Sequence, residues 1–197
     1  TDAIVNVVRC FEDENVIHVN GKVDPISDIE VIQTELCLAD LSTVEKTLVR
    51  TTKQAKAGGD KEALRLVEVL KKCDAALNQG LPVRSIDFSK EELVVLKPLC
   101  LITAKPAMFV GNVSETGFEN NPFLDRLREY AAKQNAPVVA ICAKTEAELS
   151  EMGDDDRLMF LQEMGQDEPG LNRLIRAAFK LLGLQTYFTA GVKEVRA

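Results

Sequence analysis

Three short runs of the chain are apolar at nearly every position: residues 4–10, 107–110 and 137–142. Small polar residues directly follow the second and third runs. Runs of this length and composition are typical of strands that are covered on both faces, as in a parallel sheet. Because segments with helical spacing separate the three runs, the pattern predicts an α/β fold built on a partial parallel sheet.

The long segment between the first two runs has the spacing of helices. Asp24 followed by Pro25 is a helix start signal, and the Gly58-Gly59-Asp60 sequence predicts a break and a second start. The second arm carries an apolar seam at three- and four-residue spacing, which suits one facing helix. The seam consists of Ala63, Leu66, Leu70, Cys73 and Leu77. With its charged flanks, the segment is predicted to be an antiparallel α-helical coiled-coil hairpin.

Further helices are expected downstream. Capping boxes at residues 89–92 and 145–148 predict two helix starts, and Asn121 followed by Pro122 predicts a third. Residues 169–182 have the pattern of an amphipathic helix, and residues 184–197 alternate like a strand. The side of the amphipathic helix that we expect to face the core consists of Leu171, Leu174, Ile175, Ala178 and Leu182.

The composition narrows the function classes. The 197 residues carry 24 Lys and Arg against 31 Asp and Glu, a net charge of −7, and 46% of them are hydrophobic. These values are typical of a soluble globular protein. The acidic balance and the small number of aromatic residues (8 Phe, 2 Tyr and no Trp) argue against a general nucleic-acid binder. Sequence-specific DNA binding is therefore not expected.

Membrane insertion and secretion are also disfavoured. No apolar run approaches the roughly 20 residues needed to cross a bilayer, and the N-terminus lacks a basic patch followed by an apolar stretch. Five scattered cysteines without a C-x-x-C pair indicate reduced thiols, and neither a disulfide framework nor a metal site. We therefore expect a cytoplasmic protein without a membrane partner.

The most informative motif stands where the second predicted strand ends. Residues 109–115 read FVGNVSE, and the strand ends of open α/β sheets are where ligands bind. Guanine-nucleotide switches carry N-K-x-D at this place, in which the Asp accepts two hydrogen bonds from guanine. Here Val113 replaces the lysine and Glu115 replaces the aspartate. The longer glutamate disturbs the two hydrogen bonds with guanine and so favours adenine. A polar loop without a ligand is the alternative.

A second motif follows the third predicted strand. Ala143 and Lys144 resemble the S-A-K element, whose backbone amide and lysine stem line the base pocket of nucleotide switches. Neighbouring parallel strands end at the same edge of a sheet, so the two motifs are expected to form one slot for a purine ring. Asn112, Val113 and Glu115 would recognise the base, and Ala143 and Lys144 would complete the pocket. An ordinary surface lysine is the alternative for Lys144.

Nearly the whole chain resembles the YchF/Obg-like ATPase family, a branch of the translation-factor-related P-loop NTPases. The likeness rests on residues 7–32, 111–125 and 168–197 and on the helical segment between the strands. It implies an ATP-preferring hydrolase of the cytoplasm, associated with ribosomes, with a G-like domain, a coiled-coil insertion and a TGS domain.

The resemblance also divides the chain into four segments. Residues 1–23 would be the central strand and loop of the G-like domain, and residues 24–100 the helical coiled-coil insertion. Residues 101–183 would be the base-recognition half of the G-like domain, and residues 184–197 the start of the TGS domain.

One departure from the family concerns catalysis. The sequence contains no G-x-x-x-x-G-K-[ST], so the phosphate cradle and the Mg²⁺ ligands are not in this chain. We therefore expect ATP hydrolysis in the full-length parent and none in this chain alone. The alternative is a non-catalytic interaction module whose coiled-coil arm docks on a protein or ribosomal partner.

The only histidine, His18, lies in a short segment before the helical arm. Its position alone is typical of a packed or solvent-touching residue. The resemblance implies a catalytic role instead, in which this histidine replaces the water-orienting glutamine of Ras-like GTPases.

Overall fold

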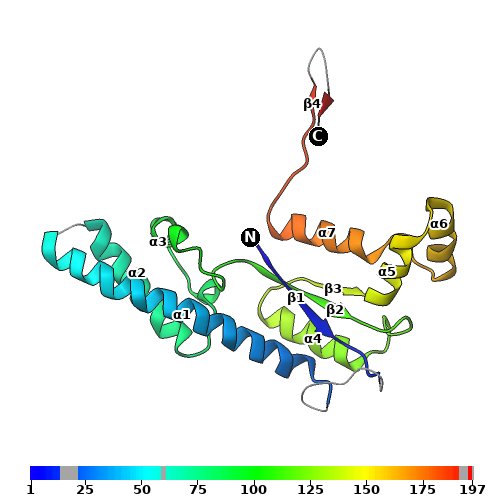
Figure 1. Cartoon of the computed structure of the whole chain (residues 1–197), viewed down its shortest axis with the longest axis horizontal. Coiled ribbons are helices and arrows are strands. Elements are labelled where there is room, and N and C mark those ends of the chain that lie inside the picture. The colour runs from blue at the N-terminus through cyan, green and yellow to red at the C-terminus, as the bar shows by residue number, and fades with distance from the viewer. Residues whose placement is uncertain (14–21, 59–60, 191–194, 197) are drawn as a thin grey trace. The chain divides into compact units, whose positions relative to one another are not determined.

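The computed structural model describes residues 1–13, 22–58, 61–190 and 195–196. The chain divides into two compact units (Figure 1). The first comprises residues 1–25 together with 107–197, and the second comprises residues 26–106. Each unit is described by itself below.

The first unit contains a three-stranded parallel sheet in the order β1-β2-β3. Its strands are β1 (Ile4–Arg9), β2 (Ala107–Asn112) and β3 (Val138–Ile141). The central strand is buried along most of its length, as expected for a strand with a neighbour on each side and helices above and below. The predicted α/β fold with a partial parallel sheet is confirmed.

Four helices accompany the sheet: α4 (Pro122–Lys133), α5 (Ala143–Glu151), α6 (Asp154–Glu163) and α7 (Gly170–Leu181). Helices α4 and α7 lie on opposite faces of the strands (Figure 1). A Cβ at Gly111 would approach Leu124 of α4 to 2.7 Å, and one at Gly170 of α7 would approach Ile141 to 2.9 Å. Glycine at these two positions therefore permits both helices to pack closely on the sheet.

Two helix starts were predicted in this unit, and only one of them is confirmed. Asn121 caps α4, because its side-chain oxygen accepts hydrogen bonds from the amides of Phe123 and Leu124, as the sequence predicted. The predicted capping box at residues 145–148 is wrong. Helix α5 begins earlier, at Ala143, with Cys142 as its N-cap, and Thr145 is buried in the first turn.

The prediction that β1 is covered on both faces is also wrong for the described residues. Val8 is 4% exposed, but Val5 and Val7 on the other face are 41% and 67% exposed. The predicted core side of α7 is likewise only partly covered, since Leu171 and Ile175 remain about half exposed. The chain thus has an apolar surface that its own described elements leave open.

The residues after α7 form a separate small element. The alternation at residues 184–197 predicted a strand, and the structure has two short ones, β4 (Thr189–Ala190) and β5 (Val195–Arg196). They pair antiparallel with each other and not with the three-stranded sheet.

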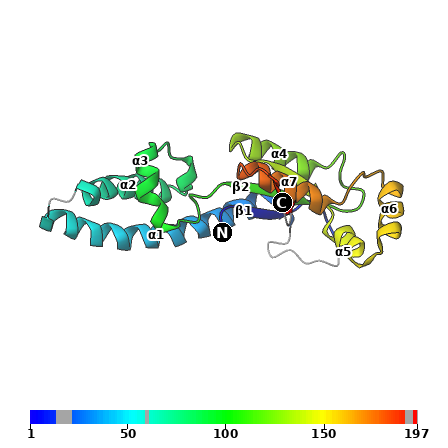
Figure 2. The same cartoon turned by 90° about the horizontal axis from the view of Figure 1, so that it is seen from above.

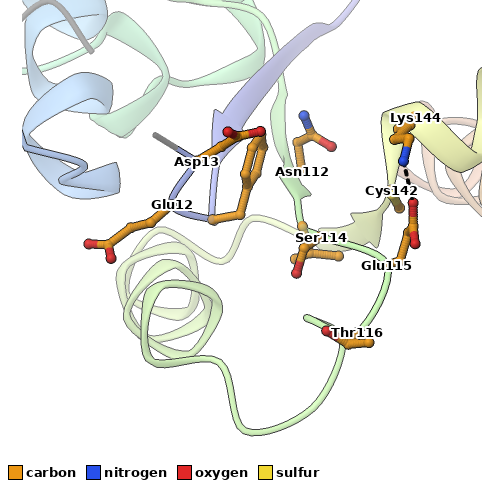
Figure 3. A pocket seen from close by; sticks show the side chains of 10 residues that line it. Glu12, Asp13, Asn112, Ser114, Glu115, Thr116, Cys142 and Lys144 are labelled. Atoms are coloured by element: carbon orange, nitrogen blue, oxygen red, sulfur yellow. Dashed lines mark hydrogen bonds and ion pairs between the residues drawn. The ribbon is translucent and has the colours of Figure 1, made fainter. Parts of the chain in front are cut away.

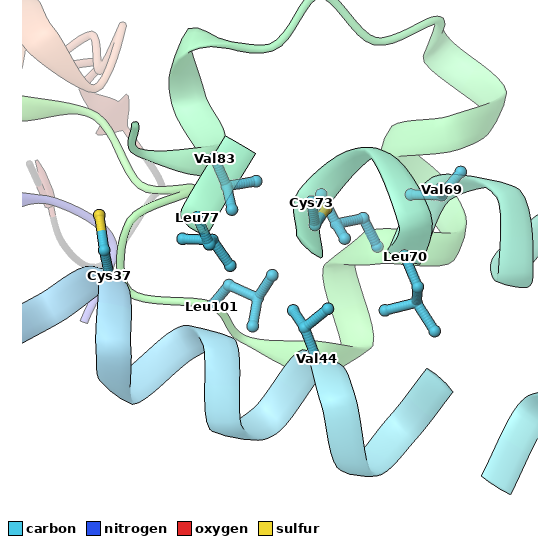
Figure 4. Close-up of a cluster of buried hydrophobic side chains, with 9 residues drawn as sticks. Cys37, Val44, Val69, Leu70, Cys73, Leu77, Val83 and Leu101 are labelled. Atoms are coloured by element: carbon cyan, nitrogen blue, oxygen red, sulfur yellow. The ribbon is translucent and has the colours of Figure 1, made fainter. Parts of the chain in front are cut away.

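The second unit is helical and has its own core. It contains α1 (Pro25–Gly58), α2 (Lys61–Leu77) and α3 (Lys90–Leu96), with short 3-10 turns η1 (Val83–Ser85) and η2 (Lys97–Leu99). Figure 2 shows α2 and α3 beside α1. Most of the predicted seam is buried, with Leu66 partly so, and the predicted capping box of Ser89 and Glu92 is present. The buried cluster consists of Cys37, Val44, Val69, Leu70, Cys73, Leu77, Val83, Leu96 and Leu101 (Figure 4).

The cysteines behave as small core residues where the sequence predicted it. Cys37 and Cys73 are 1% and 0% exposed. Burial raises the pKa of the Cys73 thiol to about 11, and the charge of Asp40 acts in the same direction. All five cysteines lie within the described residues and carry free thiols.

The buried carboxylate of Asp40 joins α1 to a distant loop. This contact was not predicted from the sequence. Asp40 is 3% exposed and accepts hydrogen bonds from the amides of Ile102 and Thr103 at 2.9 and 2.7 Å. The Thr103 hydroxyl also donates to Asp40 at 2.6 Å and accepts from the Val83 amide at 3.1 Å. Asp40 therefore holds the segment at residues 102–103 against α1.

Replacing Asp40 tests this role in the second unit. In Asp40→Ala, one buried and one partly buried amide lose their acceptor, so we expect the free energy of unfolding to fall by about 3 kcal/mol in urea denaturation. Asp87→Ala, which removes an exposed carboxylate of the same unit, is the matched control and should change it by less than about 0.5 kcal/mol. Equal effects of the two variants would contradict the role assigned to Asp40.

None of the described helices is both long and apolar enough to span a membrane.

Candidate functional site

The carboxyl ends of β2 and β3 are joined directly. Asn112 and Ile141 lie opposite each other in the parallel register. Beyond them, the side-chain oxygen of Asn112 accepts a hydrogen bond from the Ala143 amide at 3.0 Å, and the Val113 amide donates to the Ile141 carbonyl at 2.8 Å. The Ala143 amide belongs to the first turn of α5, where backbone donors lack partners within the helix. Asn112 therefore joins one strand end to the start of the next helix.

A cavity of about 430 Å³ opens at these joined strand ends (Figure 3). Its volume lies within the range of small-molecule sites, roughly 300–1,000 Å³. Residues that follow each of the three strands contribute to its walls. The lining residues are Phe11, Glu12, Asp13, Asn112, Val113, Ser114, Glu115, Thr116, Cys142 and Lys144.

An ion pair lies at the rim of the cavity. The Lys144 ammonium is 2.8 Å from a carboxylate oxygen of Glu115, and both side chains are largely exposed (Figure 3). The hydrogen bond to Glu115 and the charge of that carboxylate raise the pKa of Lys144. Because water and salt screen exposed pairs strongly, this ion pair adds little to the stability of the fold and can open for a ligand.

The cavity wall contains both apolar and polar side chains. Val113 lies behind the cavity wall and is only 1% exposed, and the Phe11 side chain is the other large apolar group of the lining. The segment after β1 is held by Arg9, whose guanidinium lies 4.8 Å from the centroid of the Phe11 ring and donates to the Phe11 carbonyl at 3.0 Å. Figure 3 shows the Glu12 side chain directed away from Asn112 and Lys144. A flat ring with polar edges is the kind of ligand that such a wall suits.

The loop that carries Val113 and Glu115 is itself anchored. The Asn121 amide group donates to the Cys10 carbonyl and to the Gly117 carbonyl, both at 2.9 Å. A Cβ at Gly117 would lie 2.8 Å from the Ser114 hydroxyl, so the Ser114 side chain would have to shift to admit a larger residue. The cap of α4 and the geometry of the cavity loop therefore depend on the same side chain.

The structure brings together four of the five residues that were predicted to recognise a base. Asn112, Val113, Glu115 and Lys144 line the cavity. The fifth, Ala143, uses its amide to bind Asn112. The roles of all five in base recognition remain predictions, and His18 lies outside the described residues.

Six lining residues were not singled out from the sequence. Phe11, Glu12 and Asp13 reach the site because β1 pairs in parallel with β2, so the chain beyond Cys10 arrives at the same sheet edge. The parallel strand order, once predicted, is the signal that could have found them. The other three are Ser114, Thr116 and Cys142, which are neighbours of predicted residues.

Among the described residues, no group of three or more His, Cys, Asp or Glu side chains is placed to hold a metal ion.

Comparison with known proteins shows which proteins this chain resembles. No family model matches the chain. The curated relative from Escherichia coli O157:H7, named "Ribosome-binding ATPase YchF", is 56% identical over 197 residues, which is all of this chain and 54% of the relative. The relative of the same name from Bacillus subtilis is 49% identical and is covered to the same extent.

A solved structure agrees with the sequence comparison. The structure titled "Structure of the Schizosaccharomyces pombe YchF GTPase" has a TM-score of 0.83 and 30% identity, and the match covers 99% of this chain and 54% of that chain. The fold is thus that of the solved YchF structure. The chain is homologous over its whole length to the YchF proteins and spans about half the length of these relatives.

Removing the side chain that joins the two strand ends gives a direct test of the site. In Asn112→Ala, the Ala143 amide loses its acceptor, so we expect its hydrogen exchange to accelerate roughly three- to tenfold, in line with the loss of one hydrogen bond. Asn172→Ala, at an exposed position of α7, is the control and should leave this exchange rate unchanged. Unaltered exchange at Ala143 in Asn112→Ala would mean that the side chain does not join the strand ends in solution.

Proposed function

We propose that the cavity at the ends of β2 and β3 binds the adenine ring of ATP, in a ribosome-associated protein that hydrolyses this nucleotide. The observation that carries the proposal is the joining of the two strand ends by Asn112, which leaves one slot with an apolar wall and a polar rim. ATP itself would supply the reactive phosphoryl group, while the residues described here would bind and orient its base.

The state of Glu115 supports adenine over guanine. Guanine presents two adjacent donors that suit a free carboxylate, whereas adenine lacks the 2-amino group and offers an acceptor at N1. The Glu115 carboxylate is paired with Lys144 at the rim, and its side chain is longer than the aspartate of N-K-x-D, which disturbs the two hydrogen bonds that guanine would donate. A pocket that leaves polar groups unmatched discriminates strongly between such ligands.

The amide of Ala143 supports the same preference. A backbone N–H that faces the base would suit the 6-oxygen of guanine and would oppose the 6-amino group of adenine, since both would then be donors. In this structure, the Ala143 amide donates to Asn112 and is not presented to the cavity. The donor that would favour guanine is therefore already occupied.

Hydrolysis would need groups beyond the residues described here. The sequence holds no G-x-x-x-x-G-K-[ST], and the described residues include no group of three or more His, Cys, Asp or Glu side chains that could hold a metal ion. We assign the phosphate and Mg²⁺ sites to the remaining length of a YchF-like protein, since the relatives are about twice as long as this chain. The exposed Val5 and Val7 of β1 offer an apolar surface that such a segment would cover.

The proposal extends to a partner and to a division into domains. Their printed names describe ribosome binding, and we propose that this chain contributes to a ribosome contact in the cytoplasm. The segment at 24–100 would be the coiled-coil insertion and the segment at 184–197 the start of a TGS domain. The alternative, a non-catalytic docking module, has one feature in its favour, because residues 26–106 form a compact unit with its own core.

Nucleotide titration of the chain tests the proposal. We expect ATP to raise the melting temperature more than GTP at equal concentration, because a ligand stabilises the state that it binds. Glu115→Asp, which restores the guanine-type carboxylate, should reduce the ratio of ATP to GTP affinity by roughly tenfold, or about 1.4 kcal/mol. Glu119→Asp, at an exposed position in the same loop, should leave the ratio unchanged.

Two outcomes of that titration would count against the proposal. No stabilisation by either nucleotide at millimolar concentration would favour the docking module. Stronger stabilisation by GTP would favour a GTPase, a name that the fission-yeast structure carries in its title.

Hydrolysis is tested in a full-length protein that contains this segment. His18→Ala should leave ATP affinity nearly intact and reduce the turnover rate by roughly 100-fold or more, the usual contribution of a positioned base. The 197-residue chain alone should release no phosphate above background. Equal turnover of His18→Ala and the parent would remove His18 from the mechanism.

A further inference from the structure

The charges of α1 are divided between its two halves. Residues 25–45 contain five Asp or Glu and no Lys or Arg, whereas residues 46–58 contain four Lys or Arg and no Asp or Glu. Neighbours on a helical surface lie three or four residues apart, and at these spacings α1 places no acidic residue next to a basic one. The helix therefore gains little from its own opposite charges, and each half has its favourable partner elsewhere.

The side of α1 that faces away from the core of the second unit also carries apolar residues. We call this side the outer stripe, and its residues follow one another at spacings of three and four: Val31, Glu35, Leu38, Ser42, Glu45, Val49, Lys53 and Lys56. Val31, Leu38 and Val49 are 50%, 58% and 59% exposed. On the inner side of the same turns, Val44 is 0% exposed. Three large apolar side chains thus remain in water on a helix that packs well on its other side.

The described elements of the second unit leave the outer stripe uncovered. Figure 2 shows α2 and α3 along one side of α1. The ion pairs of this unit lie within α2 or join α2 to α3, and none of the ion pairs among described residues includes a residue of the outer stripe. Both the apolar and the charged groups of the stripe are therefore available to a partner.

The outer stripe is complementary to a second copy of itself. Spacings of three and four residues are those of a seam between two helices. If two α1 helices pair antiparallel about a twofold axis near residues 43–44, Leu38 of each copy lies opposite Val49 of the other. In the same register, the Glu35 carboxylate of each copy lies beside the Lys53 ammonium of the other. The acidic half of one helix then faces the basic half of its partner, and each contact occurs twice.

We propose that α1 pairs antiparallel with α1 of a second copy of this chain, through the outer stripe. The apolar residues supply attraction and the charges set the orientation, because a parallel pair would place Glu35 against Glu35 and Lys53 against Lys53. The stripe holds few apolar residues, so we expect a weak dimer with a dissociation constant on the order of 10–100 µM. The pairing is independent of the proposed nucleotide site, because no residue of the stripe lines the cavity.

Exchanging the charges tests the pairing in the 197-residue chain. One variant reverses the acidic half, as Glu35→Lys with Glu45→Lys, and the other reverses the basic half, as Lys53→Glu with Lys56→Glu. The control variant, Lys90→Glu with Lys97→Glu, makes the second charge change at exposed lysines outside the stripe. Sedimentation equilibrium measures self-association at concentrations up to about 500 µM, several times the expected dissociation constant. Thermal melting checks that each variant folds.

The expected results follow from which charges meet. Each reversed variant alone should dimerise at least roughly tenfold more weakly than the unmodified chain, because like charges then face each other across the axis. A mixture of the two reversed variants should form a heterodimer at least as tight as the original dimer. The variant that combines all four changes should again dimerise by itself, and the control variant should lose less than about threefold.

A cross-link gives a test that needs no substitution. Glu35 and Lys53 are 18 residues apart on one helix, which is about 27 Å at 1.5 Å per residue. A carbodiimide joins a carboxylate directly to an amine, so an amide between these two side chains can form only between two copies. We expect mass spectrometry to find this cross-link in the unmodified chain and not in either reversed variant.

Several results would overturn the proposal. One is a monomer at every concentration tested. Another is self-association that is equal in all variants, which would assign the contact to a different surface, such as the exposed valines of β1. Failure of the two reversed variants to associate with each other would refute the antiparallel register. If a variant does not fold, the absence of the cross-link between Glu35 and Lys53 in the unmodified chain is sufficient to refute the pairing.

Discussion

The hydrogen bond between the Asn112 side chain and the Ala143 amide is the interaction on which the candidate site depends. Parallel pairing brings the ends of β2 and β3 to one edge of the sheet, but pairing alone leaves the following loops free to diverge. Asn112 holds the first residue of α5 against the end of β2, and the Val113 amide adds a second bond to β3. The cavity therefore lies between two segments whose separation is fixed, as a binding site for a rigid ring requires.

Other long-range contacts preserve this arrangement around the cavity. Glu146, in the first turn of α5, accepts hydrogen bonds from the Gly170 and Leu171 amides at 2.7 and 3.1 Å, and so caps the start of α7. Asn121 connects the cavity loop to β1. The walls are thus supported from both faces of the sheet, whereas the exposed pair of Glu115 and Lys144 at the rim remains free to rearrange. This division suits a site in which rigid parts orient a base and a polar rim selects it.

The parts that follow local patterns could be predicted from the sequence: the three strands, the caps at Ser89 and Asn121, and the meeting of two strand ends. What could not be predicted depends on pairs far apart in the chain. Asp40 and Thr103 are 63 residues apart, and Glu146 caps a helix 24 residues later. The T-x-x-E pattern at residues 145–148 was misread for a local reason, because α5 already begins at Ala143 and Cys142 is its N-cap. The exposure of Val5 and Val7 could not be predicted either, since apolar composition does not say which element covers a strand.

The most direct measurement of the central claim is an NMR titration of the isotope-labelled chain with adenosine and, separately, guanosine. The account predicts saturable shifts of the backbone amides at residues 112–115 and 142–144, with adenosine reaching saturation at a lower concentration than guanosine. Saturable shifts confined to other parts of the chain, or tighter binding of guanosine at these amides, would contradict it.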